Sequence, residues 1–106
     1  MEEAKRDFLQ MMQAVELHRS KRVLIDGQTI TGNPRTIERF YFGEFTADTV
    51  AKHQTRTASG PIRFAYVLKE PVLDPQKFGE TVAVNRGMPV KVFDSMEEAI
   101  HWLATP

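Results

Sequence analysis

The chain has 106 residues, with 14 basic and 14 acidic side chains, no cysteine and a formal net charge of zero. This balance argues against a nucleic-acid partner, and the lack of cysteine excludes disulfides and thiolate catalysis and fits a cytoplasmic location. The length suits a single domain over residues 1–106, and the charged start and short apolar runs predict neither a signal peptide nor a membrane span.

The first predicted element is an amphipathic helix that ends near His18. Its apolar residues recur at spacings of four and three, the stripe of a helix laid on a sheet. They are Ala4, Phe8, Met11, Met12 and Val15. A short buried strand, RVLID, is predicted at residues 22–26.

The loop GQTITGNP leads into a second helix, for which Asn33 is the predicted N-cap and Pro34 the first helical residue. The residues on one face of this helix are mostly small, which allows the helix to approach the sheet closely. Tyr41, Phe42 and Phe45 lie outside that face, where a surface helix is normally polar, so they need a cover. That cover is a partner, an apolar ligand or the first helix. Residues 54–61, QTRTASGP, are predicted to form a loop.

Residues 62–103 alternate strand, helix, strand and helix. The strands are predicted at 62–68 and 90–93, and the helix boundaries are marked by Asp74, Gly87 and Ser95. This order predicts an α/β fold, a βα superhelix with a mainly parallel three-stranded core and four helices. Alternate residues along the strands, which share one face of the sheet, include charged side chains. We therefore expect the helices to be concentrated on the other face. We also expect Gly79 to pack against the sheet.

The best candidate for a binding site is the loop GQTITGNP. It lies beyond the carboxyl end of a parallel strand and before a helix, where such sheets usually bind ligands, and its polar groups are Asp26, Asn33 and Arg35. The loop lacks both the G-x-G-x-x-G spacing and the P-loop lysine. Scattered histidines and the lack of a G-x-S-x-G elbow predict no metal site, no cofactor and no catalytic residues.

Three stretches of the chain resemble a known family. RVLIDGQTITG, RFYFGE and FGETVAVNRGMPVKVFDSMEEAIHWL are similar to the SpoIIAA-like family, whose fold is related to the STAS domains of anti-anti-sigma factors. The resemblance covers roughly residues 22–103 and implies a cytoplasmic bacterial protein in a family mostly without an assigned reaction. STAS switches carry a phosphorylated serine after aspartate. Here that place reads TGNPRT, so we expect neither Thr31 nor Thr36 to be phosphorylated.

The expected function is a non-catalytic regulatory or protein-binding module, and therefore not an enzyme. The alternative is a carrier or sensor of a small apolar ligand such as a lipid, because some relatives by fold bind lipids and because of the three aromatics. An enzyme would need a cleft in which Asp26, Glu44 or a histidine has a perturbed pKa.

A homodimer is also expected. Members of the family usually begin with a pair of strands, whereas this chain begins at a helix, so the sheet edge beside residues 22–26 is left without a neighbour. That edge, the aromatics at 41, 42 and 45, or both would form the twofold contact.

Overall fold

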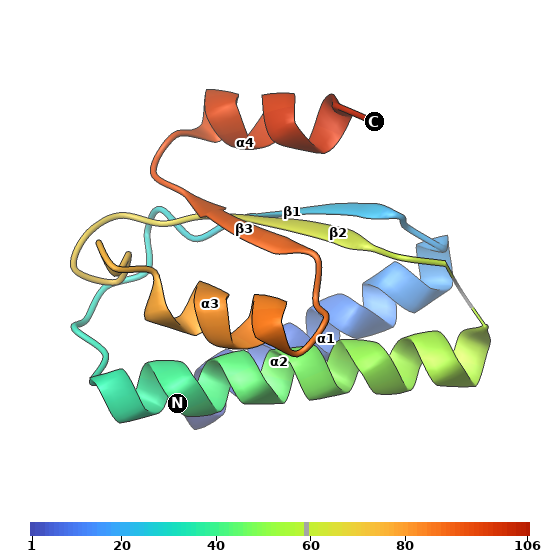
Figure 1. Cartoon of the computed structure of the whole chain (residues 1–106), viewed down its shortest axis with the longest axis horizontal. Helices are drawn as coiled ribbons and strands as arrows, with labels where there is room; N and C mark the ends of the chain where they lie inside the picture. The colour runs from blue at the N-terminus through green and yellow to red at the C-terminus, as the bar shows by residue number, and fades with distance from the viewer. Residues whose placement is uncertain (59) are drawn as a thin grey trace.

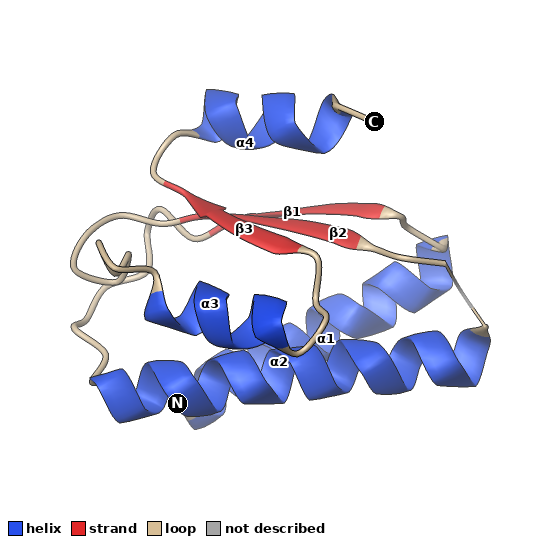
Figure 2. Cartoon of the chain, in the orientation of Figure 1, coloured by secondary structure: helices blue, strands red, loops and turns tan. Residues whose placement is uncertain are grey.

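The computed structural model describes residues 1–58 and 60–106, and these form four helices and a three-stranded sheet (Figures 1 and 2). The helices are α1 (Glu2–His18), α2 (Thr36–Thr57), α3 (Phe78–Asn85) and α4 (Met96–Ala104). The strands are β1 (Arg22–Asp26), β2 (Arg63–Val67) and β3 (Val90–Phe93). The predicted fold class, a three-stranded parallel core with four helices, is confirmed.

The strands lie in the order β1-β2-β3, and both pairings are parallel. Each connection between neighbouring strands is a crossover that carries a helix, as is usual for parallel pairing. The register places Ile25 opposite Tyr66, and Tyr66 opposite Val92. Side chains alternate between the faces of a sheet, so these three form one row on the same face.

Three helices, α1, α2 and α3, lie on one face of the sheet, and α4 lies on the other (Figure 1). The expectation of helices on one face is therefore wrong for α4. The exposed charged residues of the parity that suggested it lie on the two outer strands, Arg22 and Asp26 on β1 and Lys91 on β3. On β2 the same parity carries Ala65 and Val67, which are fully buried, and α4 covers them.

The larger core lies between the sheet and α1 to α3. Phe8 of α1 is 3% exposed and makes edge-to-face contacts with Phe42 and Phe45 of α2, with ring centroids 6.2 Å apart in each case. Such contacts add to the free energy gained from burial alone. The first helix is therefore the cover for two of the three aromatics that the sequence left unassigned.

The ends of α2 differ from the prediction. Its N-cap is Arg35, whose backbone N–H donates to the Glu38 carboxylate at 2.8 Å, so the assignment of Asn33 as N-cap and Pro34 as first residue is wrong. A glutamate at the third helical position satisfies this N–H, so the helix starts later than the proline suggests. α2 also continues to Thr57, well into the predicted loop 54–61, of which residue 59 lies outside the described residues.

The boundaries of α3 and α4 follow the sequence more closely. α3 begins only at Phe78, yet the Asp74 carboxylate accepts hydrogen bonds from the backbone N–H groups of Phe78 and Gln76, both at 3.0 Å. Asp74 thus caps the helix from outside it rather than as its N-cap. Gly87 has φ +91°, and the Ser95 hydroxyl accepts from the Glu98 N–H, so both predicted boundary roles are confirmed.

The glycine at 79 packs on α2 and not on the sheet. A Cβ at Gly79 would lie 3.3 Å from the Arg39 carbonyl oxygen, and one at Gly43 would lie 2.7 Å from the Gly79 carbonyl oxygen. The prediction that Gly79 faces the sheet is therefore wrong. The two glycines let the backbones of α2 and α3 touch, so α3 is held close to α2.

Candidate functional site

A cavity of about 530 Å³ lies between the sheet and the helices α1, α2 and α3. Its roof includes the row Ile25, Tyr66 and Val92. Apolar side chains from the helices and from the connection before β3 form most of the remaining wall. These include Phe8, Met11, Phe42, Ala83 and Met88.

The local sequence explains why space remains here. The preceding row of the sheet, Val23, Phe64 and Val90, packs directly on the larger core, and Phe64 is fully buried. Farther along the strands, small residues on α2 and α3 reach less far toward the sheet. They are Gly43, Thr46, Gly79 and Ala83.

At the carboxyl ends of the strands, the connections after β1 and β2 supply Asn33 and Leu73 to the cavity lining. This is the end at which open α/β sheets usually hold ligands. The guanidinium of Arg39 donates to the backbone carbonyls of Pro71 and Val72, both at 2.8 Å. These hydrogen bonds tie the second connection to α2 and thereby shape this end of the cavity.

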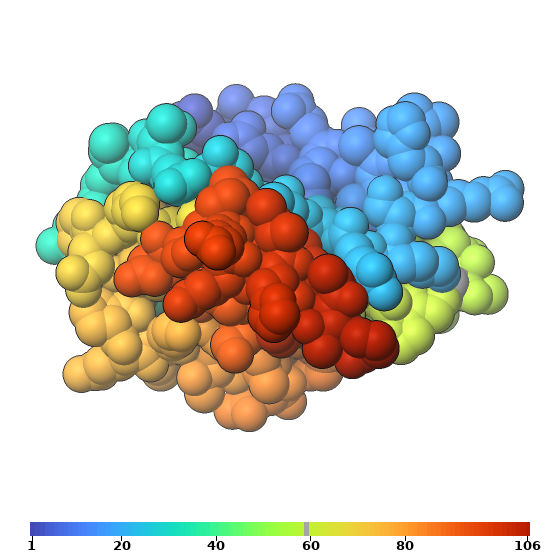
Figure 3. Space-filling view, turned by 90° about the horizontal axis from the view of Figure 1, so that it is seen from above, coloured from blue at the N-terminus to red at the C-terminus, as the bar shows by residue number. Residues whose placement is uncertain are grey.

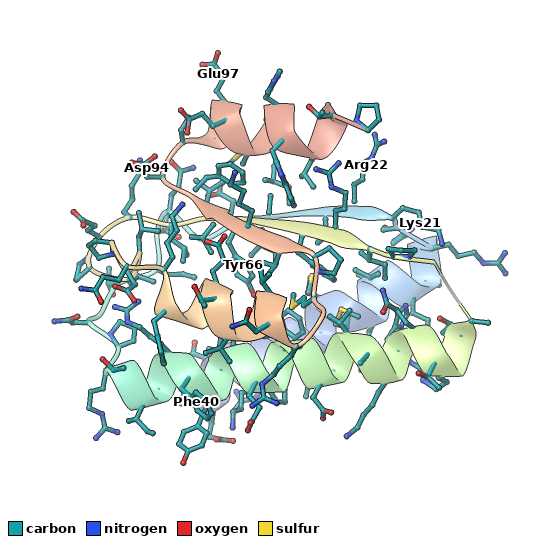
Figure 4. All side chains as sticks on the ribbon, in the orientation of Figure 1. Lys21, Arg22, Phe40, Tyr66, Asp94 and Glu97 are labelled. Atoms are coloured by element: carbon teal, nitrogen blue, oxygen red, sulfur yellow. The ribbon has the colours of Figure 1, made fainter. Side chains whose placement is uncertain are left out.

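Few polar groups face the interior. The Tyr66 side chain lies between the sheet and the helices beneath it (Figure 4). Burial raises the pKa of its hydroxyl well above the usual range, so the phenol stays protonated at neutral pH. The Thr46 hydroxyl is used by its own helix, donating to the Gly43 carbonyl at 3.1 Å. The Glu80 carboxylate accepts from the Val92 N–H at 3.3 Å.

The structure separates the three predicted ligand residues. Asn33 lines the cavity. Asp26 is exposed and accepts from the side chain and backbone of Gln28, at 3.0 and 3.2 Å, and these bonds lower its pKa. Arg35 lies outside the cavity and pairs with Glu38 at 3.3 Å. The shifted pKa of Asp26 therefore reflects a turn, not a cleft.

The three predicted aromatics fall into two environments, and Tyr41 and Phe45 share the second, a hollow outside the cavity. Phe42 lines the cavity, and Phe45 packs on Phe8 with the Lys5 ammonium 5.4 Å from its ring centroid. Tyr41 is 52% exposed and contacts the edge of the Phe40 ring. Only Phe42 is thus placed to touch a molecule inside the cavity.

Sequence reasoning missed Tyr66 as a site residue. Tyr66 shares its strand parity with Phe64 and Leu68, so periodicity alone groups it with the core residues of the strand. The signal was present, however, because a tyrosine in a row of apolar residues brings a hydroxyl that needs a partner.

Nothing in the described part of the chain gathers three histidine, aspartate or glutamate side chains as a metal would require. Glu44, considered as a catalytic acid, forms an ion pair with Arg86 at 2.7 Å. Along residues 1–58 and 60–106, no helix has both the length and the apolar character needed to cross a membrane.

Comparison with known proteins does not assign the chain to a family. No family model, curated protein or solved structure matches it. The SpoIIAA-like resemblance therefore stays a prediction, and the case for function depends on the cavity.

Proposed function

We propose that this domain binds a small, largely apolar molecule in its cavity, as a carrier or sensor rather than as an enzyme. The observation that supports this is the cavity itself, because about 530 Å³ of space walled mainly by apolar and aromatic side chains falls within the size range of ligand sites. Protein interiors are otherwise close-packed, and unfilled apolar space costs stability. A ligand that fills it would regain those contacts.

The cavity favours this function over the protein-binding module that the sequence placed first. That prediction rested on the fold and on the absence of recognisable catalytic groups, whereas Phe42, one of the aromatics behind the ligand alternative, lines the cavity. The SpoIIAA-like resemblance agrees with a ligand carrier, since some relatives by fold bind lipids. A bacterial origin and a cytoplasmic location remain parts of the same prediction.

Titration with N-phenyl-1-naphthylamine, an uncharged apolar dye that fluoresces in apolar surroundings, tests the proposal. We expect saturable binding to the wild-type protein. Val92→Trp should weaken it at least tenfold, because Val92 lines the cavity from β3 and the larger side chain occupies the space.

Val84→Trp is the matched control, since Val84 is 47% exposed and lies outside the cavity lining. It should bind the dye as the wild type does. Saturating dye should also raise the melting temperature of the wild type and of this control, because a ligand that binds only the folded state stabilises it. Equal binding by both tryptophan variants would contradict the proposal.

A further inference from the structure

The hydroxyl of Tyr66 is a hydrogen-bond donor without a protein acceptor in the part of the chain that the structure describes. In that part, the His53 Nδ1 is the only fully enclosed side-chain nitrogen or oxygen that lacks a partner. The Tyr66 hydroxyl is therefore not sealed in the protein, and Tyr66 lines the cavity. Its hydrogen is available to whatever occupies that space.

A phenylalanine at this position would pack in the same row with Ile25 and Val92 without bringing a polar group inside. An unpaired hydroxyl costs free energy unless an acceptor is present. In a site with an apolar wall, a few placed polar groups fix the orientation of the ligand. Tyr66 has the position and the protonation state for that role, because a neutral phenol donates.

The charged groups around the cavity disfavour an anion beside Tyr66. Arg39 is engaged with two backbone carbonyls, and the Asp74 carboxylate with the start of α3. The Glu80 carboxylate is bound to the N–H of Val92, the residue paired with Tyr66 across the sheet. A ligand carboxylate at Tyr66 would therefore meet negative charge in a poorly solvated space.

One cation offers a competing arrangement. Lys77 lines the cavity, precedes α3, and has no ion-pair partner among the described residues. A ligand carboxylate would pair with Lys77 and leave the Tyr66 hydroxyl unused. The two arrangements thus differ in the charge of the ligand and in the residue that recognises it.

We propose that the cavity selects an uncharged molecule that carries one hydrogen-bond acceptor, such as a ketone, ester or alcohol oxygen, and that the Tyr66 hydroxyl donates to this acceptor. The inference rests on the proposed apolar-ligand function and specifies the class of ligand.

Three probes with the same number of carbon atoms separate the possibilities. Hexanophenone has a neutral acceptor, hexylbenzene has none, and 6-phenylhexanoate is an anion. Each competes with N-phenyl-1-naphthylamine for the wild type and for Tyr66→Phe, whose fold is checked by circular dichroism and thermal melting. We expect the ratio of hexanophenone affinity to hexylbenzene affinity to be roughly fivefold higher for the wild type than for Tyr66→Phe, the effect of one ordinary hydrogen bond. Comparing the two proteins cancels the cost of removing the ketone oxygen from water.

Hexylbenzene should bind Tyr66→Phe at least as tightly as the wild type, because the variant leaves no hydroxyl unpaired beside this probe. The anion should be the weakest competitor for the wild type. The same ratio of hexanophenone affinity to hexylbenzene affinity for the wild type and for Tyr66→Phe would overturn the inference.

Lys77→Gln tests the competing arrangement. If 6-phenylhexanoate binds the wild type most tightly and this variant weakens it, Lys77 recognises a carboxylate and the inference fails, although the apolar-ligand function stands. If the dye and all three probes fail to bind the wild type, both the inference and the proposed function fail. The two failures are therefore distinguishable.

Discussion

The two faces of the sheet are filled in different ways. On one face, a single short helix, α4, lies over β2, and its Ala99 and Leu103 pack with Ala65, Val67 and Phe93. Figure 3, seen from that side, shows α4 in red across the middle of the molecule. On the other face, three helices together cover the sheet and leave a cavity. The same strands thus support one closely packed side and one side with room for a ligand.

The difference follows from how the helices are held. α4 is fixed to the sheet by side chains, including Arg63, whose guanidinium lies 4.2 Å from the centre of the Trp102 ring. α3 is fixed instead to α2, through the backbone contact at Gly43 and Gly79. A helix bound to another helix need not fill the space above the sheet. Cavity formation therefore depends on helix–helix contact as much as on the size of the lining residues.

The largest expected effect contrasts phenylalanines on the two faces. Phe93→Ala should lower the free energy of unfolding by about 3–5 kcal/mol, because Phe93 is buried in the closely packed side. Phe42→Ala should cost only about 1–2 kcal/mol, because Phe42 is partly buried and already borders empty space. Urea unfolding measures both. Equal losses would show that the two faces are packed alike.

Adding a methyl group at the glycine contact between α2 and α3 should have the next largest effect on stability. Gly43→Ala places a Cβ 2.7 Å from the Gly79 carbonyl oxygen, which forces α3 away from α2. We expect a net loss of about 2 kcal/mol, since overpacking exceeds the gain in helix propensity. Gly60→Ala is the control, because its Cβ would have Lys21 Nζ, at 3.9 Å, as its nearest neighbour among the described residues beyond the adjacent ones. An unchanged midpoint for Gly43→Ala would contradict the role of this contact.

Removing the side-chain fixation of α4 should have a smaller effect. The Arg63 guanidinium donates to the backbone carbonyls of Trp102, at 2.7 Å, and Thr105, so it holds the end of α4. Arg63→Leu should cost about 1–2 kcal/mol and speed hydrogen exchange at the end of α4. Arg22→Leu, an exposed position on the neighbouring strand, should change neither. Similar effects of both variants would show that the loss of charge alone matters.

The smallest expected effect is a pH dependence of stability that arises from Tyr66, on the face of the sheet that borders the cavity. Burial raises the pKa of Tyr66 in the folded state above its unfolded value near 10. As the pH rises, the unfolded protein therefore loses the Tyr66 hydroxyl proton before the folded protein does. The stability that the protonated hydroxyl contributes is complete below about pH 10 and declines above that pH. Between pH 8 and pH 11 the free energy of unfolding of the wild type should fall by about 1 kcal/mol more than that of Tyr66→Phe. Parallel pH profiles of the two proteins would mean that water reaches the hydroxyl freely.

Much of the fold could be predicted because its signals are local. Alternation in strands and a three- to four-residue period in helices depend only on neighbouring residues, and Gly87 and Ser95 act within one turn. The start of α2 was missed because two local signals compete there, and the Glu38 carboxylate outweighs Pro34 by capping Arg35. The candidate site was predicted only as a region, the carboxyl end of the strands. Of its three named residues, only Asn33 lines the cavity.

The sequence by itself determined the order of the strands and helices, the parallel pairing and the apolar stripe of α1, since each follows from backbone geometry and local periodicity. Only the tertiary structure decided that α1 covers Phe42 and Phe45, that α4 takes the opposite face, and that Gly79 meets Gly43. Those outcomes depend on which surfaces fit together across long stretches of chain. The cavity beside Tyr66 belongs to this second group, because an unfilled space is a property of the whole packing and of no single segment.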